Sequence, residues 1–149
     1  MLSDAKKHLL LLVEDDEADA IFFNWALKKS GLDCAVKHVL DGLAAVDYLR
    51  KASTSDPDSL PRTIFLDLKM PGMNGFEVLS WFADQPSLSH IPMVVLTGSD
   101  LPSDRERACA LGAAEYLVKP VQVTDLQRLL GDIRSATTAG GVRAGRVEA

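Results

Sequence analysis

The sequence predicts an α/β fold in which helices cover both faces of a parallel β-sheet. Apolar, strand-like runs recur five times, and a helix-like segment follows each of them. This alternation is typical of a doubly wound sheet. The first and third runs are almost wholly aliphatic, as expected of strands that are covered on both faces. The five predicted strands are residues 9–13, 35–40, 63–68, 93–97 and 115–118.

Taken in order, these elements fit a flavodoxin-like sheet of five strands in the order 2-1-3-4-5, with five helices. The run 35–40 mixes polar and apolar residues and suits an edge strand. The segment 51–62, KASTSDPDSLPR, separates the second helix from the third strand and reads as a loop of about a dozen residues. The stretch 136–149 lacks apolar periodicity and is expected to be disordered. A single domain over 8–135 with a tail over 136–149 is therefore predicted.

Local signals support several of the helices. In the first helix, apolar residues at helical spacing predict one buried stripe, with Trp25 in the core, and Gly31 is suited to end that helix. Asn74 followed by Glu77 has the spacing of an N-cap and its reciprocal partner. Ser103 and Glu106 repeat this spacing before the fourth helix, which Gly112 can end. The predicted stripe consists of Ala18, Ile21, Phe22, Trp25 and Ala26.

Composition restricts the function classes. The chain has 149 residues, 47% of them hydrophobic and 25% charged, which matches one globular domain. A formal charge of −5 argues against direct binding to nucleic acid. The longest apolar run near the start, LLLLV, is too short for a signal peptide or a membrane span, so a cytoplasmic protein is expected. Cys34 and Cys109 read as buried or half-buried free thiols. The histidines, which lack metal-pair spacing, read as surface or strand-edge residues; they are His8, His38 and His90.

Three carboxylates stand at strand ends. Glu14 and Asp15 end the first strand and Asp67 ends the third, and these strands flank the point where the strand order reverses. Like charges gathered there repel one another unless a cation is present. Hard oxygen ligands favour Mg²⁺, which is usually held by only one or two carboxylates together with phosphate oxygens, so the cluster predicts both a metal ion and a phosphoryl group.

A hydroxyl and an ammonium complete the pattern. Thr97 ends the fourth strand, and Lys119 follows the fifth, directly before Pro120. Together with the carboxylates they suit phosphoryl transfer by positioning and charge neutralisation. Considered one at a time, each residue also has a plainer interpretation. Asp67 could be a solvated residue at a strand end, Thr97 a turn former and Lys119 a surface charge. The acidic residues of the first helical turn read as complements of that helix N-terminus, outside the site; they are Asp16, Glu17 and Asp19.

Four motifs together resemble the receiver domain of two-component response regulators. They are LLVED at the first strand, LDLKMPGMNG at the third, VVLTG at the fourth and YLVKP at the fifth. The resemblance implies that Asp67 accepts a phosphoryl group, that Asp15 binds Mg²⁺ and that Glu14 assists through water. It also implies that the backbone carbonyl of Lys69 completes the metal shell.

Further roles follow from the same resemblance. Thr97 and Lys119 would bind phosphoryl oxygens, Lys119–Pro120 would be a cis peptide, and Thr97 with Tyr116 would form the switch. A sensor histidine kinase would be the phosphodonor, so the chain would be a phosphoacceptor that supports its own phosphorylation and dephosphorylation and not an enzyme in the usual sense. The long loop before the third strand and the absence of an output domain resemble single-domain regulators of phytochrome-type kinases. Receivers also pair through the face corresponding to residues 103–135, which implies a homodimer.

Other functions remain open at this stage. A receiver-like docking module would bind partners without phosphate turnover. A magnesium-dependent phosphatase is disfavoured because Lys69, and not a second acid, stands two residues after Asp67. A flavin-binding flavodoxin is disfavoured because acids follow the first strand where a phosphate loop would be needed.

Overall fold

The computed structural model describes residues 8–138, with positions 132–138 described by their helical backbone alone. It contains one five-stranded parallel sheet in the order β2-β1-β3-β4-β5, which confirms the predicted fold. The strands are β1 His8–Val13, β2 Cys34–Val39, β3 Thr63–Leu66, β4 Met93–Thr97 and β5 Glu115–Val118. The five α-helices are α2 Glu17–Ser30, α3 Gly42–Ser55, α4 Gly75–Ala83, α5 Pro102–Ala110 and α6 Val123–Thr138, and two 3₁₀ turns lie at Pro57–Ser59 and Pro86–Leu88.

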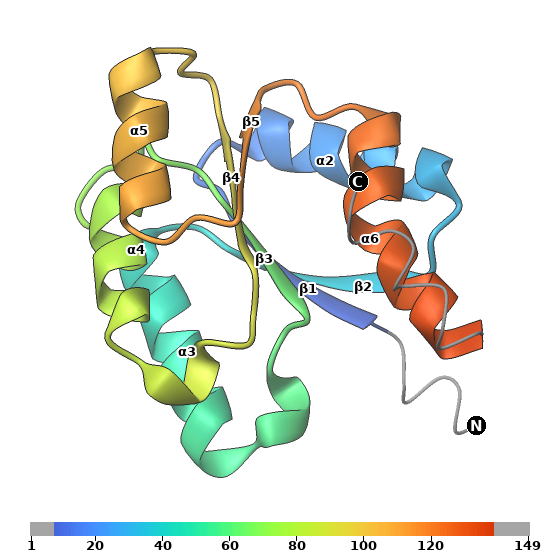
Figure 1. The fold of residues 1–149 in the computed structure, drawn as a ribbon, viewed down its shortest axis with the longest axis horizontal. Coiled ribbons are helices and arrows are strands. Elements are labelled where there is room, and N and C mark those ends of the chain that lie inside the picture. The colour runs from blue at the N-terminus through green and yellow to red at the C-terminus, as the bar shows by residue number, and fades with distance from the viewer. Residues whose placement is uncertain (1–7, 139–149) are drawn as a thin grey trace.

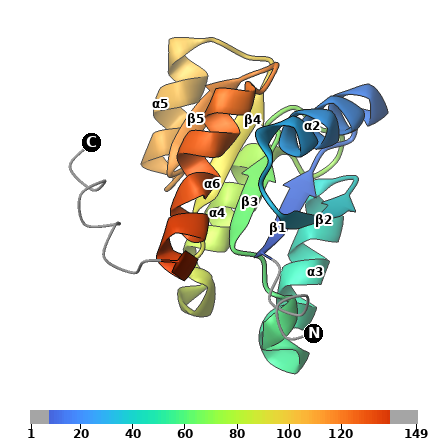
Figure 2. The ribbon, with the colours of Figure 1, turned by 90° about the vertical axis from the view of Figure 1, so that its right-hand side faces the viewer.

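The helices form two layers, one on each face of the sheet. Helices α2 and α6 cover one face and α3, α4 and α5 cover the other (Figures 1 and 2). Alternate residues of β1 therefore point into different cores: Leu10 and Leu12 pack with α2 and α6, while Leu11 and Val13 pack with the other layer. The four residues of β3 are all buried, whereas β2 alternates between exposed and half-buried residues until its last position. The central and edge strands were thus predicted correctly.

Helix α2 turns a different face to the core from the predicted one. Its buried residues are Ala20, Phe23, Ala26, Leu27 and Ser30. Ile21 and Trp25 are 62% and 51% exposed, so the core position of Trp25 and most of the predicted stripe were wrong, whereas Ala26 is buried as predicted. The sequence offers two apolar stripes at helical spacing, and contact with β1 and α6 selects the one that contains Phe23. Ile21, Phe22 and Trp25 of the other stripe are left facing solvent.

The helix ends were predicted with mixed success. Asn74 and Glu77 form the expected capping box at α4, and Gly31 ends α2 in the left-handed conformation. At α5, however, the N-cap is Leu101, without a side-chain bond, because Pro102 starts the helix and places Ser103 inside it. Gly112 has the positive φ expected at the end of α5.

Two segments expected to be irregular are partly helical. Residues 51–55 belong to α3, and the 3₁₀ turn Pro57–Ser59 follows, so the predicted loop at 51–62 is shorter than expected. The Tyr48 hydroxyl donates to the Ser59 carbonyl and ties this turn to the helix. In the predicted tail, positions 136–138 continue α6. The remaining tail positions, 139–149, lie outside the described residues.

The positions of the cysteines and histidines agree with the predictions except for that of Cys109. Cys34 is half-buried in β2, but Cys109 is exposed on α5, contrary to expectation, and both thiols are free. His8 and His38 lie half-buried in strands and His90 is exposed, as expected. Within residues 8–138, none of the helices is both long enough and apolar enough to cross a membrane.

Candidate functional site

The backbone of the sheet brings the strand-end acids together. Val13 and Leu66 are partners in the β1–β3 register, and the Asp67 amide donates to the Val13 carbonyl at 3.1 Å. Glu14 and Asp67 therefore leave adjacent strands at the same edge. Gly75 permits the tight turn after β3, because a Cβ there would lie 2.5 Å from the carbonyl oxygen of Asp67.

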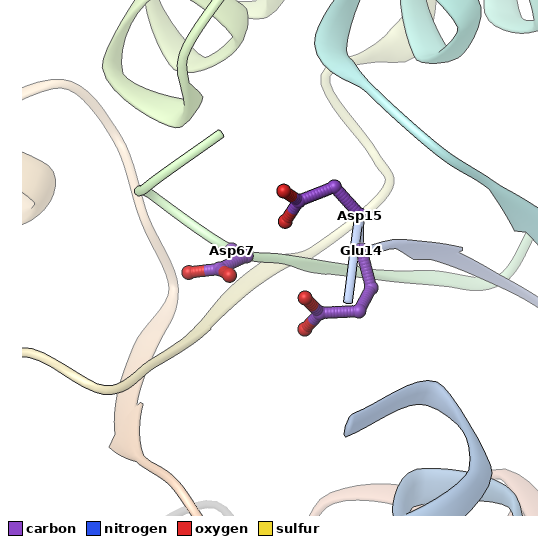
Figure 3. Close-up of side chains that lie close together, drawn as sticks. All are labelled: Glu14, Asp15 and Asp67. Carbon is purple, nitrogen blue, oxygen red and sulfur yellow. The ribbon is translucent and has the colours of Figure 1, made fainter. Parts of the chain in front are cut away.

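Glu14, Asp15 and Asp67 form one cluster, in which oxygens of the three carboxylates lie within 4.8 Å of one another. Figure 3 shows the three groups facing a common space. Glu14 and Asp67 are buried, with 2% and 5% of their surface exposed, whereas Asp15 is exposed. The sequence prediction that these three residues converge is correct in its geometry.

Lys119 reaches this cluster from the opposite side. Its Nζ donates to Asp67 Oδ2 at 3.0 Å and lies 2.8 Å from Glu14 Oε1. The Lys119–Pro120 peptide is cis, as expected from the resemblance. The Lys119 amide donates to the Thr97 carbonyl at 2.8 Å, so β4 fixes the backbone from which the lysine extends.

The third partner of the ammonium is Asp19, which the sequence analysis placed outside the site. Lys119 Nζ donates to Asp19 Oδ2 at 2.7 Å, the shortest of its three contacts. Asp19 and Phe23 stand four residues apart and share the face of α2 that turns to the sheet. Asp19 was left out because acids in the first helical turn were interpreted as complements of the helix N-terminus, and the buried position of Phe23 shows that Asp19 lies on the inward side of α2.

Burial and charge shift the proton affinities within the site. Burial raises the pKa of Glu14 to about 7, and hydrogen bonds from Lys119 and the Asp16 amide offset this only in part. Burial by itself lowers the pKa of Lys119. The hydrogen bonds to its three carboxylate partners outweigh that effect and hold the lysine pKa above its ordinary value.

A pocket of about 440 Å³ opens over these groups. Its wall includes Lys69 and Ser99 together with the acids and Lys119; the full lining is Asp15, Asp16, Asp19, Asp67, Lys69, Gly98, Ser99 and Lys119. Glu14 and Thr97 are buried and do not belong to that lining. The Lys69 side chain is 64% exposed, and its amide donates to Asp67 Oδ1 at 3.2 Å.

The turn after β1 is held by groups that sequence reasoning did not identify. The Asp16 amide donates to Glu14 Oε2 at 3.0 Å, and Asp16 also caps α2 through the Asp19 amide, as expected for an acid at that helix end. The ring of His38, from β2, hydrogen-bonds the Glu14 carbonyl at 2.8 Å. No local pattern links positions 14 and 38, because the contact depends on the β1–β2 pairing.

Tyr116 turns inward beside the turn after β4. It is 6% exposed, and its hydroxyl donates to the Ser99 carbonyl at 3.0 Å. Ser99 Oγ donates to Asp104 Oδ2 at 2.6 Å, and the Arg105 guanidinium lies 4.6 Å from the centre of the Tyr116 ring. These contacts connect the turn that follows Thr97 to both α5 and β5.

Comparison with known proteins agrees with this geometry. The family described as the response regulator receiver domain matches residues 10–131. One relative is the probable methanogenesis regulatory protein FilR2 of Methanothrix harundinacea. It is 39% identical to this chain over 126 residues, and the alignment covers 85% of this chain and 81% of the relative. The response regulator Rcp1 of Synechocystis is 35% identical over 127 residues, or 85% of this chain and 86% of the relative.

Similar solved structures are also response regulators. The Mn²⁺-bound form of Rcp1 superposes with a TM-score of 0.68 at 35% identity, covering 86% of this chain and 92% of Rcp1. The phosphorylated cyanobacterial phytochrome response regulator RcpA superposes with a TM-score of 0.70 at 30% identity, covering 90% of this chain and 96% of RcpA. With its sheet order, its strand-end acids and its cis Lys119–Pro120 peptide, the chain belongs to the response regulator receiver domain family of two-component signalling.

Proposed function

We propose that residues 8–135 act as a phosphorylation switch in which Asp67 accepts a phosphoryl group from a histidine kinase. The observation that carries this proposal is the pairing of buried Asp67 with the Lys119 ammonium at 3.0 Å, beside two further strand-end acids. The Mn²⁺-bound and phosphorylated relatives support the same chemistry.

In the proposed reaction, a carboxylate oxygen of Asp67 attacks the phosphorus atom of the donor phosphohistidine. The new O–P bond forms as the N–P bond breaks, and the electron pair of that bond stays on the imidazole nitrogen. Lys119 neutralises charge on the phosphoryl oxygens, and the Thr97 hydroxyl binds one of them. Water later hydrolyses the acyl phosphate, so the protein supports its own dephosphorylation.

The donor set of the site fits a divalent cation. Its four carboxylates, Glu14, Asp15, Asp19 and Asp67, face one ammonium, which leaves excess negative charge at the sheet edge. Hard oxygen donors favour Mg²⁺, with Glu14, Asp15, Asp67 and the Lys69 carbonyl as the proposed ligands. When bound, the cation supplies neutralisation of the phosphoryl charge.

The proposed switch joins Thr97 and Tyr116. Thr97 is fully buried at the end of β4, and the inward hydrogen bond of Tyr116 to Ser99 holds the turn that follows it. Movement of the Thr97 hydroxyl toward a phosphoryl group would alter that turn and its contacts with α5. This route leads to residues 103–135, the proposed homodimer surface, which sedimentation velocity with and without phosphodonor would test.

The exposed stripe of α2 is the proposed kinase-docking surface. Ile21, Phe22 and Trp25 are 62%, 39% and 51% exposed, respectively. A second pocket, lined in part by Phe22, shares Asp19 and Lys119 with the acidic pocket, so the apolar stripe adjoins the site of chemistry. A kinase helix packed here would bring its phosphohistidine to the pocket, and a phytochrome-type kinase is the proposed donor.

Intact mass spectrometry tests the proposal. Incubation with Mg²⁺ and acetyl phosphate should add one phosphate to the protein and none to Asp67→Asn. Asp84→Asn, which changes an exposed aspartate at the end of α4, is the matched control and should be phosphorylated normally. If the wild type gains no phosphate, the docking-module alternative replaces the switch.

The docking surface needs a separate test. Trp25→Ala should slow phosphotransfer from a ³²P-labelled phytochrome-type histidine kinase while leaving the reaction with acetyl phosphate unchanged. Equal slowing with both donors would instead indicate damage to the site.

A further inference from the structure

Asp19 binds Lys119 without belonging to the carboxylate cluster. The lysine ammonium has three hydrogens, and its three contacts are with Glu14, Asp19 and Asp67. Glu14 and Asp67 also belong to the group of acids whose oxygens lie within 4.8 Å, whereas Asp19 does not. A positive group that binds the cluster therefore competes with Lys119 for Glu14 and Asp67. The contact between Lys119 and Asp19 is not subject to that competition.

The backbone of Asp19 is fixed at the start of a helix. It lies in the first turn of α2, and its amide donates to Asp16 Oδ1 at the helix N-cap. The Asp19 carboxylate takes no part in that cap. Four carbons separate the Lys119 ammonium from its backbone, so the position of the ammonium depends on what it binds.

Lys119 has space on two sides. It lines both the acidic pocket and a neighbouring, largely apolar pocket of about 330 Å³ that includes Phe22, Leu96 and Val121. Among the residues that the structure describes, Asp19 is the only acid lining both of these pockets. The Asp19 carboxylate, 2.7 Å from the ammonium, therefore lies where the two pockets meet.

We propose that Asp19 is a positioning residue that holds the Lys119 ammonium beside Asp67 for phosphoryl transfer. The inference rests on the proposed function of Asp67 and adds a residue on α2 to the groups that govern its reaction. Asp19 acts through the lysine and does not touch the phosphoryl group. Its carboxylate is 43% exposed, so its contribution is a modest one.

Phosphorylation rates provide the first test. With acetyl phosphate, an Asp67 oxygen attacks phosphorus and acetate leaves with the electron pair of the broken bond. Asp19→Asn should lower the adduct-formation rate about fivefold, and Asp19→Glu, which keeps the charge, should restore much of it. Glu17→Gln is the matched control: it removes the same charge from the same helical turn, and Glu17 is not among the ion-pair partners of Lys119.

A double-mutant cycle separates positioning from a general effect of charge. In a Lys119→Ala background, Asp19→Asn should no longer lower the rate, because the lysine through which Asp19 acts is absent. An equal loss in both backgrounds, or a wild-type rate in Asp19→Asn, would overturn the inference. Absence of any adduct in the wild type would instead overturn the proposed function.

Stability measured with a chelator present gives a readout independent of activity. Asp19→Asn should lower the urea midpoint of unfolding in the wild-type background and should not lower it in Lys119→Ala. Equal midpoints for the wild type and Asp19→Asn would contradict the proposed hold on Lys119, whatever the rates.

Discussion

At the scale of single residues, the site is a balance between one ammonium group and four carboxylates. Lys119 stabilises Glu14 and Asp67 in places where burial alone would disfavour their charges. Asp15 lies at the exposed side of the cluster and is better hydrated. The two buried acids, which need a counterion most, are therefore both contacted by Lys119, which also contacts the half-exposed Asp19.

Glu14 should make stability depend on pH when a chelator is present. Its pKa is raised to about 7 in the folded protein from an ordinary 4.5, so the folded state binds the Glu14 proton more tightly than the unfolded state does. The contribution of this proton to the free energy of unfolding is therefore fully present below about pH 4.5 and is lost as pH rises through 7. Urea unfolding between pH 4.5 and 7.5 should show this loss in the wild type. Glu14→Gln cannot titrate at this position, so any stability advantage of the wild type over this variant should shrink or reverse as pH rises. Parallel curves of unfolding free energy against pH for the two proteins would contradict the raised pKa of Glu14.

At the scale of elements, α2 carries two apolar stripes with different tasks. Phe23 packs in the core, its ring centre 4.9 Å from that of Phe65, while Trp25 lies on the exposed side near Phe22 and Lys29. The residue pattern is compatible with either stripe facing the sheet. The other elements packed around α2 decide between them.

Alanine substitutions should distinguish the two stripes. Phe23→Ala should cost about 3–5 kcal/mol in the free energy of unfolding, because it leaves a cavity between α2 and the sheet. Trp25→Ala should cost less than about 1 kcal/mol, since it removes only surface contacts. Urea denaturation measures both, and comparable costs would show that Trp25 packs in the core after all.

The helix caps provide a second comparison between elements. Asn74→Ala should destabilise the protein by about 1 kcal/mol, because it removes the acceptor of the Glu77 amide in the capping box. Ser103→Ala, at the position with the same sequence signature, should cost almost nothing because Ser103 lies inside α5. Thermal unfolding of the two variants tests the assignment, and equal losses would refute it.

At the scale of the whole molecule, the parallel sheet gathers groups from distant parts of the chain at one edge. Residues 14, 67 and 119 meet because β1, β3, β4 and β5 are neighbours and point the same way. The chemistry thus depends on the complete fold. Ligands at this edge should in turn stabilise all of it.

A divalent cation should raise the unfolding temperature of the protein. At one hundred times its dissociation constant, Mg²⁺ should add about 2.7 kcal/mol, or about 5–10 °C for a domain of this size. Differential scanning fluorimetry with Mg²⁺ or with a chelator at matched ionic strength measures the shift. Asp15→Asn should reduce it, and Lys119→Ala should increase it because the ammonium shares Glu14 and Asp67 with the cation. An unchanged shift in Asp15→Asn would exclude Asp15 as a ligand.

The sequence by itself determined the sheet and the convergence of its strand-end residues. Aliphatic runs specify buried strands, and parallel strands carry Glu14, Asp67 and Lys119 to a common edge whatever the packing details. The motifs around these residues also sufficed to indicate the family and the cis bond before Pro120.

Tertiary structure alone decided which stripe of α2 is buried, and with it that Asp19 binds Lys119. It likewise decided that His38 supports the turn at Glu14 and that α5 starts at Pro102. Local sequence signals are degenerate in such cases, because two helix faces or two caps satisfy the same spacing. The choice is made by contacts between segments far apart in the chain, which local periodicity does not encode.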